Sequence, residues 1–368
     1  MWTTHLCSTV TGDKLVQLDL TALQDLSWSR RLNGIGTGSL KLDLESIGTG
    51  SSIAARRDDR RRLLTPWDVT VVRSWQDASL ARPLAVYAGI LINPDYHEPT
   101  GALTFSHAEL REIFKSRHTF GVDGYTPKGK VVYENESLAS LAGRLVRLAV
   151  EGPRANYRLP IVLPAVGMPG PASRTWFDYN LNRIEDELVE VQNDEGGPDV
   201  DFLPRWSDQD RLEWVPRIGT LTGSPAEWNL AAPDSPVTGF ALKGNADQQA
   251  NVIYATGEGS EEKLPVRSGW QTTDTPALER AEAYSQVRNG RVLQSHADAL
   301  VLSQQKPVSD WELSIQADAQ PGIADLALGQ QHRVYTQNDP WVFDGWKDDL
   351  RLVGFSGNLT NTIALQLQ

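Results

Sequence analysis

The sequence predicts a mainly β protein with α+β inserts, in which two β-barrel-like domains, early and late in the chain, enclose smaller α/β domains. Apolar and polar residues alternate in many short segments, such as Leu40–Leu44 and Thr362–Leu367, and this period of two is typical of half-buried strands. The 30 glycines and 21 prolines supply many turns. Helical spacing of leucines is confined to the interior of the chain.

Residues 1–112 are expected to form the first β-barrel domain, with strands around residues 233–256 as candidates to complete it. The segments that predict its strands are Leu15–Leu20, Leu40–Leu44, Trp67–Val72, Leu84–Ile92 and Leu103–Ser106. Asn33-Gly34 and Asn93-Pro94 mark turns between them. Closely spaced strands with polar turns favour a barrel or a sandwich.

Residues 113–220 are expected to form an α+β module. Ser137 is placed to cap a helix in which Leu138, Leu141, Leu145 and Leu148 share one face. A second amphipathic helix is predicted over roughly Asp178–Gln192. The strands Val200–Trp206 and Arg211–Ile218 follow as a hairpin.

Residues 221–368 are expected to form the second β-barrel-like domain, with a helical insert at about 275–305. Thr275-Pro276 predicts the start of a helix that ends near Arg288, and a second helix is predicted over about Val292–Gln304. The predicted strands are Val237–Lys243, Asn251–Thr256, Trp311–Ala317, His332–Thr336, Leu350–Ser356 and Thr362–Leu367.

The composition narrows the classes of function. The single cysteine, Cys7, excludes a disulfide framework within the chain and a cysteine-based zinc site. A net charge of −12 argues against a protein that wraps nucleic acid. The N-terminus does not resemble a signal peptide, and no apolar run approaches the roughly 20 residues of a membrane span. We therefore expect folding in a reducing cytoplasm.

The sequence predicts no catalytic site. It contains no HExxH pair and no GxSxG elbow. His107 and His118 lie near Glu109 and Glu112, and we interpret all four as surface polar residues on a short helix. The glycines of the two Gly-rich clusters are interpreted as turn residues, because no Walker lysine follows them; they are Gly34, Gly36, Gly38, Gly48 and Gly50. We expect no catalytic residue, no cofactor-binding residue, no metal ligand and no cofactor.

Three clusters allow two interpretations each. The acids of the second helix are interpreted as a solvated face, because neighbouring acids point around a helix, whereas a glycosidase needs two that converge; they are Glu185, Asp186, Glu187, Glu190, Asp194 and Glu195. The run Arg56–Arg62 is interpreted as a solvated loop or helix end, with pairing to an acidic neighbouring subunit as the alternative. For Trp206, Trp214, Trp341 and Trp346, packing in a core or subunit interface is preferred over stacking on sugars.

Three segments together resemble the tail hub, or minor tail protein, of long-tailed phages of actinobacteria. The first comprises TPWDVTVVRSW and LAVYAGILINPDYHEPTGALTFSHAELREIFKSR. The second comprises FDYNLNRIEDELVEVQNDEGGPDVDFLPRW and RLEWVPRIG. The third is WVFDGWKDDLRLVGFSGNLTNTIALQLQ. The resemblance covers nearly the whole chain and rests on the order and spacing of these segments.

The resemblance implies a virion component at the tail tip, made in the host cytoplasm and related to the hub of contractile tails. Two similar barrels would alternate around a homotrimer in a pseudo-sixfold ring. The implied partners are the distal tail protein ring, the tape measure protein and other minor tail proteins, while DNA would pass through the lumen without specific binding. No enzymatic activity and no membrane insertion are expected. A carbohydrate-binding or adhesion module for the host cell wall is the first alternative, and a cell-wall hydrolase is the second.

Overall fold

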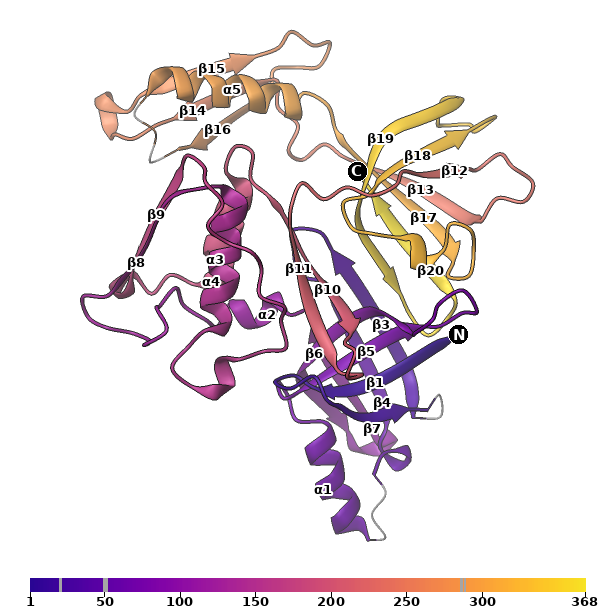
Figure 1. The fold of residues 1–368 in the computed structure, drawn as a ribbon. Coiled ribbons are helices and arrows are strands. Elements are labelled where there is room, and N and C mark those ends of the chain that lie inside the picture. The colour runs from indigo at the N-terminus through magenta and orange to yellow at the C-terminus, as the bar shows by residue number, and fades with distance from the viewer. Residues whose placement is uncertain (20–21, 49–51, 285–286, 288) are drawn as a thin grey trace. The chain divides into compact units, whose positions relative to one another are not determined.

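The computed structural model describes residues 1–19, 22–48, 52–284, 287 and 289–368. Strands hold 42% of the residues and helices 20%, so the prediction of a mainly β protein is confirmed. The chain divides into two compact units (Figure 1). The larger unit comprises Met1–Gly239 and Leu313–Leu367, and the smaller comprises Phe240–Glu312 with Gln368.

The larger unit is built on one long sheet. Its strands follow the order β17-β20-β19-β3-β4-β7-β6-β5-β1-β2, and β18 joins β19 and β12 beside this path. Their bounds are β1 Trp2–Ser8, β2 Lys14–Leu18, β3 Leu23–Arg31, β4 Thr37–Asp43, β5 Val69–Trp75, β6 Leu84–His97, β7 Ala102–Ala108, β12 Ala226–Asn229, β17 Val308–Gln316, β18 Gln331–Thr336, β19 Gly345–Gly357 and β20 Thr362–Leu367. Strand β13 (Val237–Asn245) pairs with β17, and the division between the units falls within both strands.

None of the sheets closes into a barrel among the described residues. The first seven strands nevertheless bury side chains on both faces. On one face Trp28 stacks on Tyr87, with ring centroids 5.8 Å apart, and Leu40 lies opposite Phe105 in the β4–β7 register. On the other face Val72 belongs to a second hydrophobic cluster that it shares with the helices. Strand β5 is therefore buried along its whole length, including its polar residues Thr70, Arg73 and Ser74, and Arg73 donates to the Thr4 hydroxyl at 2.8 Å.

The helices α3 (Leu138–Val150) and α4 (Ile184–Asn193) form the centre of the α+β module, together with the short α2 (Arg111–Phe114). The sheets β8–β9 (Lys130–Glu136 and Ala172–Phe177) and β10–β11 (Asp199–Trp206 and Leu212–Gly219) complete it. The predicted cap is confirmed, because the Ser137 hydroxyl accepts a hydrogen bond from the Ser140 amide at 3.2 Å. Helix α4 begins six residues later than predicted, since Asp178–Asn180 form a 3₁₀ turn that ends at Leu181 in the left-handed region.

The smaller unit packs helix α5 (Gly290–Gln304) on a three-stranded sheet, β15-β14-β16, of Val266–Trp270, Val252–Thr256 and Glu279–Ala283. The helix predicted from Pro276 to Arg288 is wrong over 279–283, which form strand β16; positions 285, 286 and 288 lie outside the described residues. The buried Asn251 explains the difference. Its side chain bonds Thr273, Thr275 and the Pro276 carbonyl and accepts from the Leu278 amide, which leads the chain into a parallel pairing with β14.

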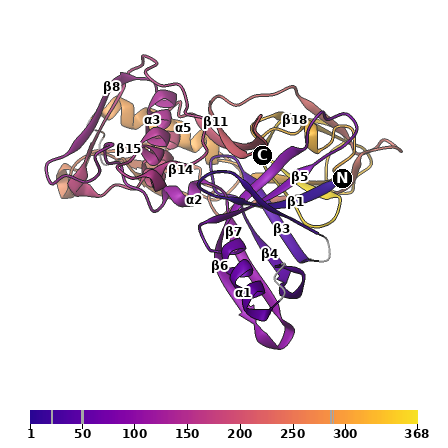
Figure 2. The same cartoon turned by 60° about the horizontal axis from the view of Figure 1, so that its bottom comes forward.

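The remaining helices are short or peripheral. Helix α1 (Ile53–Leu63) stands at one end of the first sheet in Figures 1 and 2. The 3₁₀ helices are Leu44–Ser46, Glu98–Thr100, Ala155–Tyr157, Asp178–Asn180, Glu261–Lys263 and Ile323–Asp325. In the described part of the chain, no helix is both long enough and apolar enough to span a membrane.

Candidate assembly surfaces

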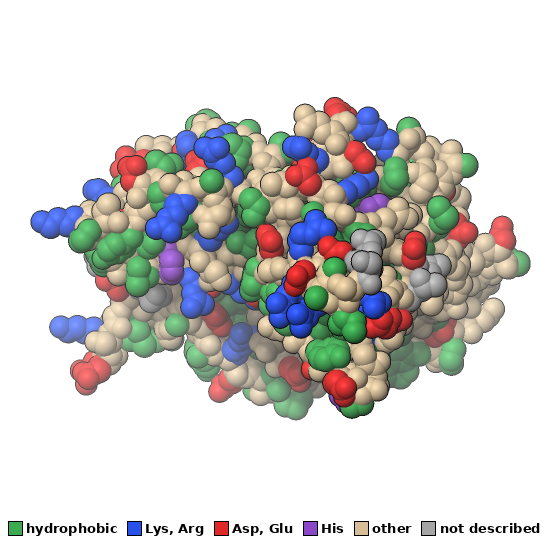
Figure 3. Space-filling view, turned by 90° about the horizontal axis from the view of Figure 1, so that it is seen from below, with side chains coloured by type: hydrophobic (Ala, Val, Ile, Leu, Met, Phe, Trp, Pro, Cys, Tyr) green, Lys and Arg blue, Asp and Glu red, His purple; other side chains and the backbone are tan. Residues whose placement is uncertain are grey.

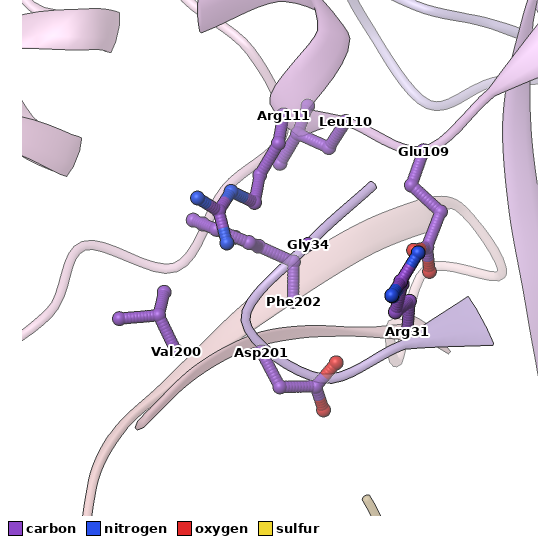
Figure 4. A pocket seen from close by; sticks show the side chains of 8 residues that line it. All are labelled: Arg31, Gly34, Glu109, Leu110, Arg111, Val200, Asp201 and Phe202. Atoms are coloured by element: carbon purple, nitrogen blue, oxygen red, sulfur yellow. The ribbon is translucent and has the colours of Figure 1, made fainter. Parts of the chain in front are cut away.

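A small cavity lies where the β3–β4 turn, the start of α2 and strand β10 meet (Figure 4). It is lined by Arg31, Gly34, Glu109, Leu110, Arg111, Val200, Asp201 and Phe202. Its volume is about 10 Å³, close to the smallest space that holds one water molecule. The cavity therefore offers no room for a substrate.

A buried ionic network beside this cavity joins segments far apart in sequence. The Arg30 guanidinium donates to Asp201 and, at 3.2 Å, to Glu109. Burial raises the pKa of Glu109 to about 7, against the opposing effect of the Arg30 charge. Perturbed carboxylates often mark functional sites, but here both oxygens are engaged, since the second accepts from the Gly36 amide at 2.7 Å. The arrangement holds β3, β10 and the β7–α2 connection together.

The interpretation of the histidine–glutamate cluster as a solvent-exposed surface is wrong for two of its members. His107 lies on β7 and is buried, with its Nδ1 2.7 Å from the Tyr87 hydroxyl, and Glu109 is bound to Arg30. His118 instead bonds the Leu181 carbonyl, and Glu112 pairs with Lys115. The four residues do not form a base and its orienting partner. Alternation along β7 turns His107 inward, which the sequence pattern around it did not reveal.

The acidic helix is only partly solvated, which corrects a second interpretation. Glu185 is buried and receives two hydrogen bonds from the equally buried Arg111, at 3.0 and 2.8 Å. Glu187 accepts from the Trp176 indole at 2.6 Å and from Asn182. These carboxylates have fixed structural partners, so α4 does not present two converging acids.

Cys7 is buried, and burial raises the pKa of its thiol to about 12. A thiol with so high a pKa is a poor nucleophile at neutral pH. The interpretation of the first glycine cluster as turn residues is confirmed for Gly34, in the β3–β4 turn, and is wrong for Gly38, which lies in strand β4, where a Cβ would lie 2.1 Å from the Ser27 carbonyl oxygen of the paired strand β3. Gly48 has φ of +97°, and Gly50 lies outside the described residues.

The arginine run forms most of helix α1, and this side of the molecule carries a group of basic side chains in Figure 3. The helix begins at a cap in which the Ser52 hydroxyl accepts from the Ala55 amide at 3.1 Å. Arg56 and Arg60 pair with Glu45 at 3.4 Å. Arg57 and Arg61 are exposed and form no ion pair with the described residues. Part of the positive charge of α1 is thus free for a partner.

A groove lined by both apolar and polar side chains runs between α1 and the edge strand β2. Strand β2 ends the long sheet, so in the described part of the chain its outer edge has no strand partner. The groove, which we call the β2–α1 groove, has a volume of about 330 Å³. Its apolar lining comprises Leu15, Val16, Leu18, Ile47 and Leu63, and its charged lining comprises Asp19, Asp59 and Arg62. Exposed edges and apolar grooves are typical of surfaces that become covered in an assembly.

The four tryptophans considered for sugar binding separate into two pairs. Trp206 and Trp214 are buried in the cluster around α3 and α4, as preferred from the sequence. Trp341 and Trp346 lie in and beside the β18–β19 turn and are 82% and 43% exposed. Phe343, which no sequence pattern marked, is 95% exposed. We call residues 337–346, which carry these three rings, the aromatic loop.

The aromatic loop is held in one conformation by its own aspartates. The Asp339 carboxylate accepts from the amides of Trp341 and Val342 at 2.8 and 2.7 Å. Asp344 accepts from the Asn338 amide at 2.6 Å. The Thr336 hydroxyl bonds the Phe343 carbonyl at 2.9 Å. Exposed aromatic side chains on an ordered turn lose little further entropy on binding, which suits them to anchor a contact.

Neither family models nor curated proteins match this sequence. Solved structures do. The 43 kDa tail protein of prophage MuSo2 from Shewanella oneidensis is 9% identical, with a TM-score of 0.59 over 100% of this chain and 98% of that chain. A tail protein from Neisseria meningitidis MC58 is 11% identical, with a TM-score of 0.58 over 100% and 96%. A chain of the half-lidded Francisella PdpA–VgrG complex is 9% identical, with a TM-score of 0.55 over 100% and 57%. The chain therefore shares its fold with these two tail proteins and with the Francisella chain.

Proposed function

We propose that this chain is a non-enzymatic structural protein of a phage tail tip, a tail hub that works as a homotrimer. The observation that carries the proposal is the likeness of fold to two tail proteins, over 98% and 96% of their lengths. In the proposed trimer, the early and late β parts of the chain alternate as barrel-like domains around a pseudo-sixfold ring. The division into residues 1–112, 113–220 and 221–368 belongs to this proposal.

The surface chemistry supports a role in assembly. The edge strand β2, the groove beside it and the aromatic loop expose groups that a subunit contact would cover. The most perturbed carboxylate, Glu109, is fully engaged by its neighbours, and Cys7 is held protonated. These observations favour a surface function over a reaction.

The proposed partners are the distal tail protein ring, the tape measure protein and other tip proteins, in the tail of a long-tailed phage of actinobacteria. DNA would pass through the lumen without specific binding, consistent with a net charge of −12. The protein would be made in the host cytoplasm and become part of the virion without entering a membrane.

The test is the stoichiometry of the native particle. Sedimentation velocity of the purified chain should give a trimer or a larger ring, and electron microscopy of the intact tail should place three copies at its tip. A chain that stays monomeric at every concentration, and that is absent from purified tails, would refute the proposal.

A carbohydrate-binding module for the host cell wall is the second candidate, because Trp341 and Phe343 are almost fully exposed and aromatic rings stack on sugars. A pull-down on isolated cell walls decides between the two functions. Binding that is lost in Trp341→Ala and kept in Trp206→Ala would favour the adhesion module, since Trp206 is buried.

A further inference from the structure

We propose that the aromatic loop of one copy of this chain inserts into the β2–α1 groove of a second copy. The contact deepens the proposed function, on which it rests, by naming the residues through which copies join. Both surfaces belong to the larger unit. The loop is a projection with exposed rings, and the groove is a partly apolar recess in the same protein.

The apolar parts match in size and character. The groove volume of about 330 Å³ lies at the lower end of the range for ligand pockets, roughly 300–1,000 Å³, and it is enough for one or two aromatic side chains. Its walls carry Leu15, Leu18 and Leu63. Trp341 and Phe343 are the most exposed aromatic side chains described, at 82% and 95%. Their contact with the aliphatic part of the groove lining removes this surface from water.

The charges around the two surfaces are opposite. Helix α1 carries five arginines and two aspartates, a net charge of +3. Residues 337–349 carry four aspartates and one lysine, a net charge of −3. Asp348 and Asp349 form no ion pair with the described residues, and neither do Arg57 and Arg61 of the helix. Each surface thus supplies the counter-charges that the other lacks.

A second cavity, beside the edge strand β12, fits the loop less well. It is larger, at about 630 Å³, and its lining includes Glu227 and Asp325 and no lysine or arginine, whereas the β2–α1 groove sets Arg62 beside Asp19 and Asp59 and lies along the basic helix α1. Glu227 and Asp325 would face the aspartates that flank the aromatic loop. Electrostatic repulsion therefore favours the β2–α1 groove as the acceptor.

The occupant is a second copy because the basic helix and the acidic loop have opposite net charges, and among the described residues of one chain they form no hydrogen bond or ion pair with each other. A contact between unlike patches of identical chains is heterologous, so each copy uses its loop toward one neighbour and its groove toward the other. Repetition of such a contact closes a ring when the rotation between copies permits it.

Cross-linking tests the contact directly. Chains with Pro340→Cys, next to Trp341, are mixed with chains that carry Gln17→Cys, on the groove wall, and then oxidised. Cys7 is buried and contributes little background. We expect a disulfide-linked dimer from the mixture only. A matched control replaces Gln17→Cys with Tyr254→Cys, an exposed position of the smaller unit; equal cross-linking in the control would overturn the proposal.

Mixing two variants, one altered in the loop and one altered in helix α1, tests whether the contact joins these two unlike surfaces. One variant carries Trp341→Ser with Phe343→Ser, and the other carries Arg61→Glu with Arg62→Glu. All four side chains are exposed, so folding should be retained, which circular dichroism checks. Each variant alone should associate at least about tenfold more weakly than the wild type. Their equimolar mixture should give dimers and nothing larger, because only one intact contact remains.

The outcomes separate this inference from the proposed function. A wild-type trimer whose assembly is unchanged by the loop and helix substitutions would overturn the docking alone. A wild type that is monomeric at all concentrations would overturn the proposed function. Loop substitutions that abolish binding to cell-wall glycans and leave assembly intact would also overturn the docking and assign the loop to sugar recognition.

Discussion

His107 and His332 are buried rings that tie the stability of the larger unit to pH. Burial lowers the pKa of each to about 4, whereas an exposed histidine titrates near 6.5. Between these values the unfolded chain binds more protons than the folded chain. The contribution of these two histidines to stability is therefore expected to be fully present above about pH 6.5 and to fall as the pH drops towards 4, while Glu109, whose pKa burial raises to about 7, acts in the opposite direction over part of this window.

The substitution His332→Asn should remove part of this dependence. The Nδ1 atom of His332 accepts from the Trp228 indole at 2.8 Å, and an asparagine oxygen can take the same bond without titrating. Between pH 7.5 and 5, the free energy of unfolding in urea should fall by about 2 kcal/mol more in the wild type than in the variant. The exposed His97→Asn serves as the control; an equal change in the wild type and in His332→Asn would contradict the assignment.

Arg30 holds two carboxylates that have little contact with water. Its replacement by methionine keeps most of the side-chain volume but leaves Glu109 and Asp201 buried without their main counter-charge, although Arg217 stays 3.3 Å from Asp201. Removal of one partner from a buried ion pair costs about 3–5 kcal/mol. Chemical unfolding should show a loss of this order for Arg30→Met. In Arg61→Met, which removes an exposed charge, the change should stay below about 0.5 kcal/mol.

Strand β16, at one edge of the three-stranded sheet β15-β14-β16, depends on the buried side-chain amide of Asn251. Asn251 fixes the segment 273–278 by four hydrogen bonds and so presents Glu279–Ala283 as a strand. Asn251→Ala should destabilise the smaller unit by about 2–3 kcal/mol, because several partners lose their bond at once. Hydrogen exchange should accelerate in β14 and β16, while β1–β7 keep their protection. The control Thr275→Ala removes one bonding hydroxyl and should show a clearly smaller effect.

Local sequence patterns predicted those helices and strands in which the spacing of apolar residues matches the side chains that the fold buries. The leucines of α3 and the Ser137 cap were found in this way, as were most strands with alternating side chains. Strand β16 was missed, because its pairing with β14 depends on Asn251, which lies far away in sequence. Strand β3 was missed as well; its sequence is LQDLSWSRR, in which polar side chains interrupt the apolar alternation.

The candidate surfaces were predicted only in outline. Trp341 and Trp346 were noted in the sequence, but only the structure separates these exposed rings from the buried Trp206 and Trp214. The groove beside α1 combines residues of β2 with residues more than 40 positions later, which no local pattern could bring together. The ion pair between Arg30 and Asp201 spans 171 positions, and no pattern in the sequence indicates it.

Assembly of the whole molecule should depend on salt in a way that identifies the charges involved. The Debye length falls from about 10 Å at 0.1 M salt to about 3 Å at 1 M. Attraction between α1 and residues 337–349 of a neighbouring copy would be screened, so the dissociation constant of the wild-type assembly should rise between these conditions. Sedimentation velocity over a range of protein concentrations measures it.

Charge reversal should invert the sign of this salt dependence. In Arg61→Glu with Arg62→Glu, helix α1 changes from a net charge of +3 to −1, so it repels the aspartates of the incoming loop. Screening then relieves repulsion, and the variant should associate more tightly at about 1 M salt than at 0.1 M. Adding Asp348→Arg should restore part of the association at low salt. Parallel salt curves for the wild type and the double variant would mean that these charges lie outside the contact, since only charges that face each other across it can change the sign of the response.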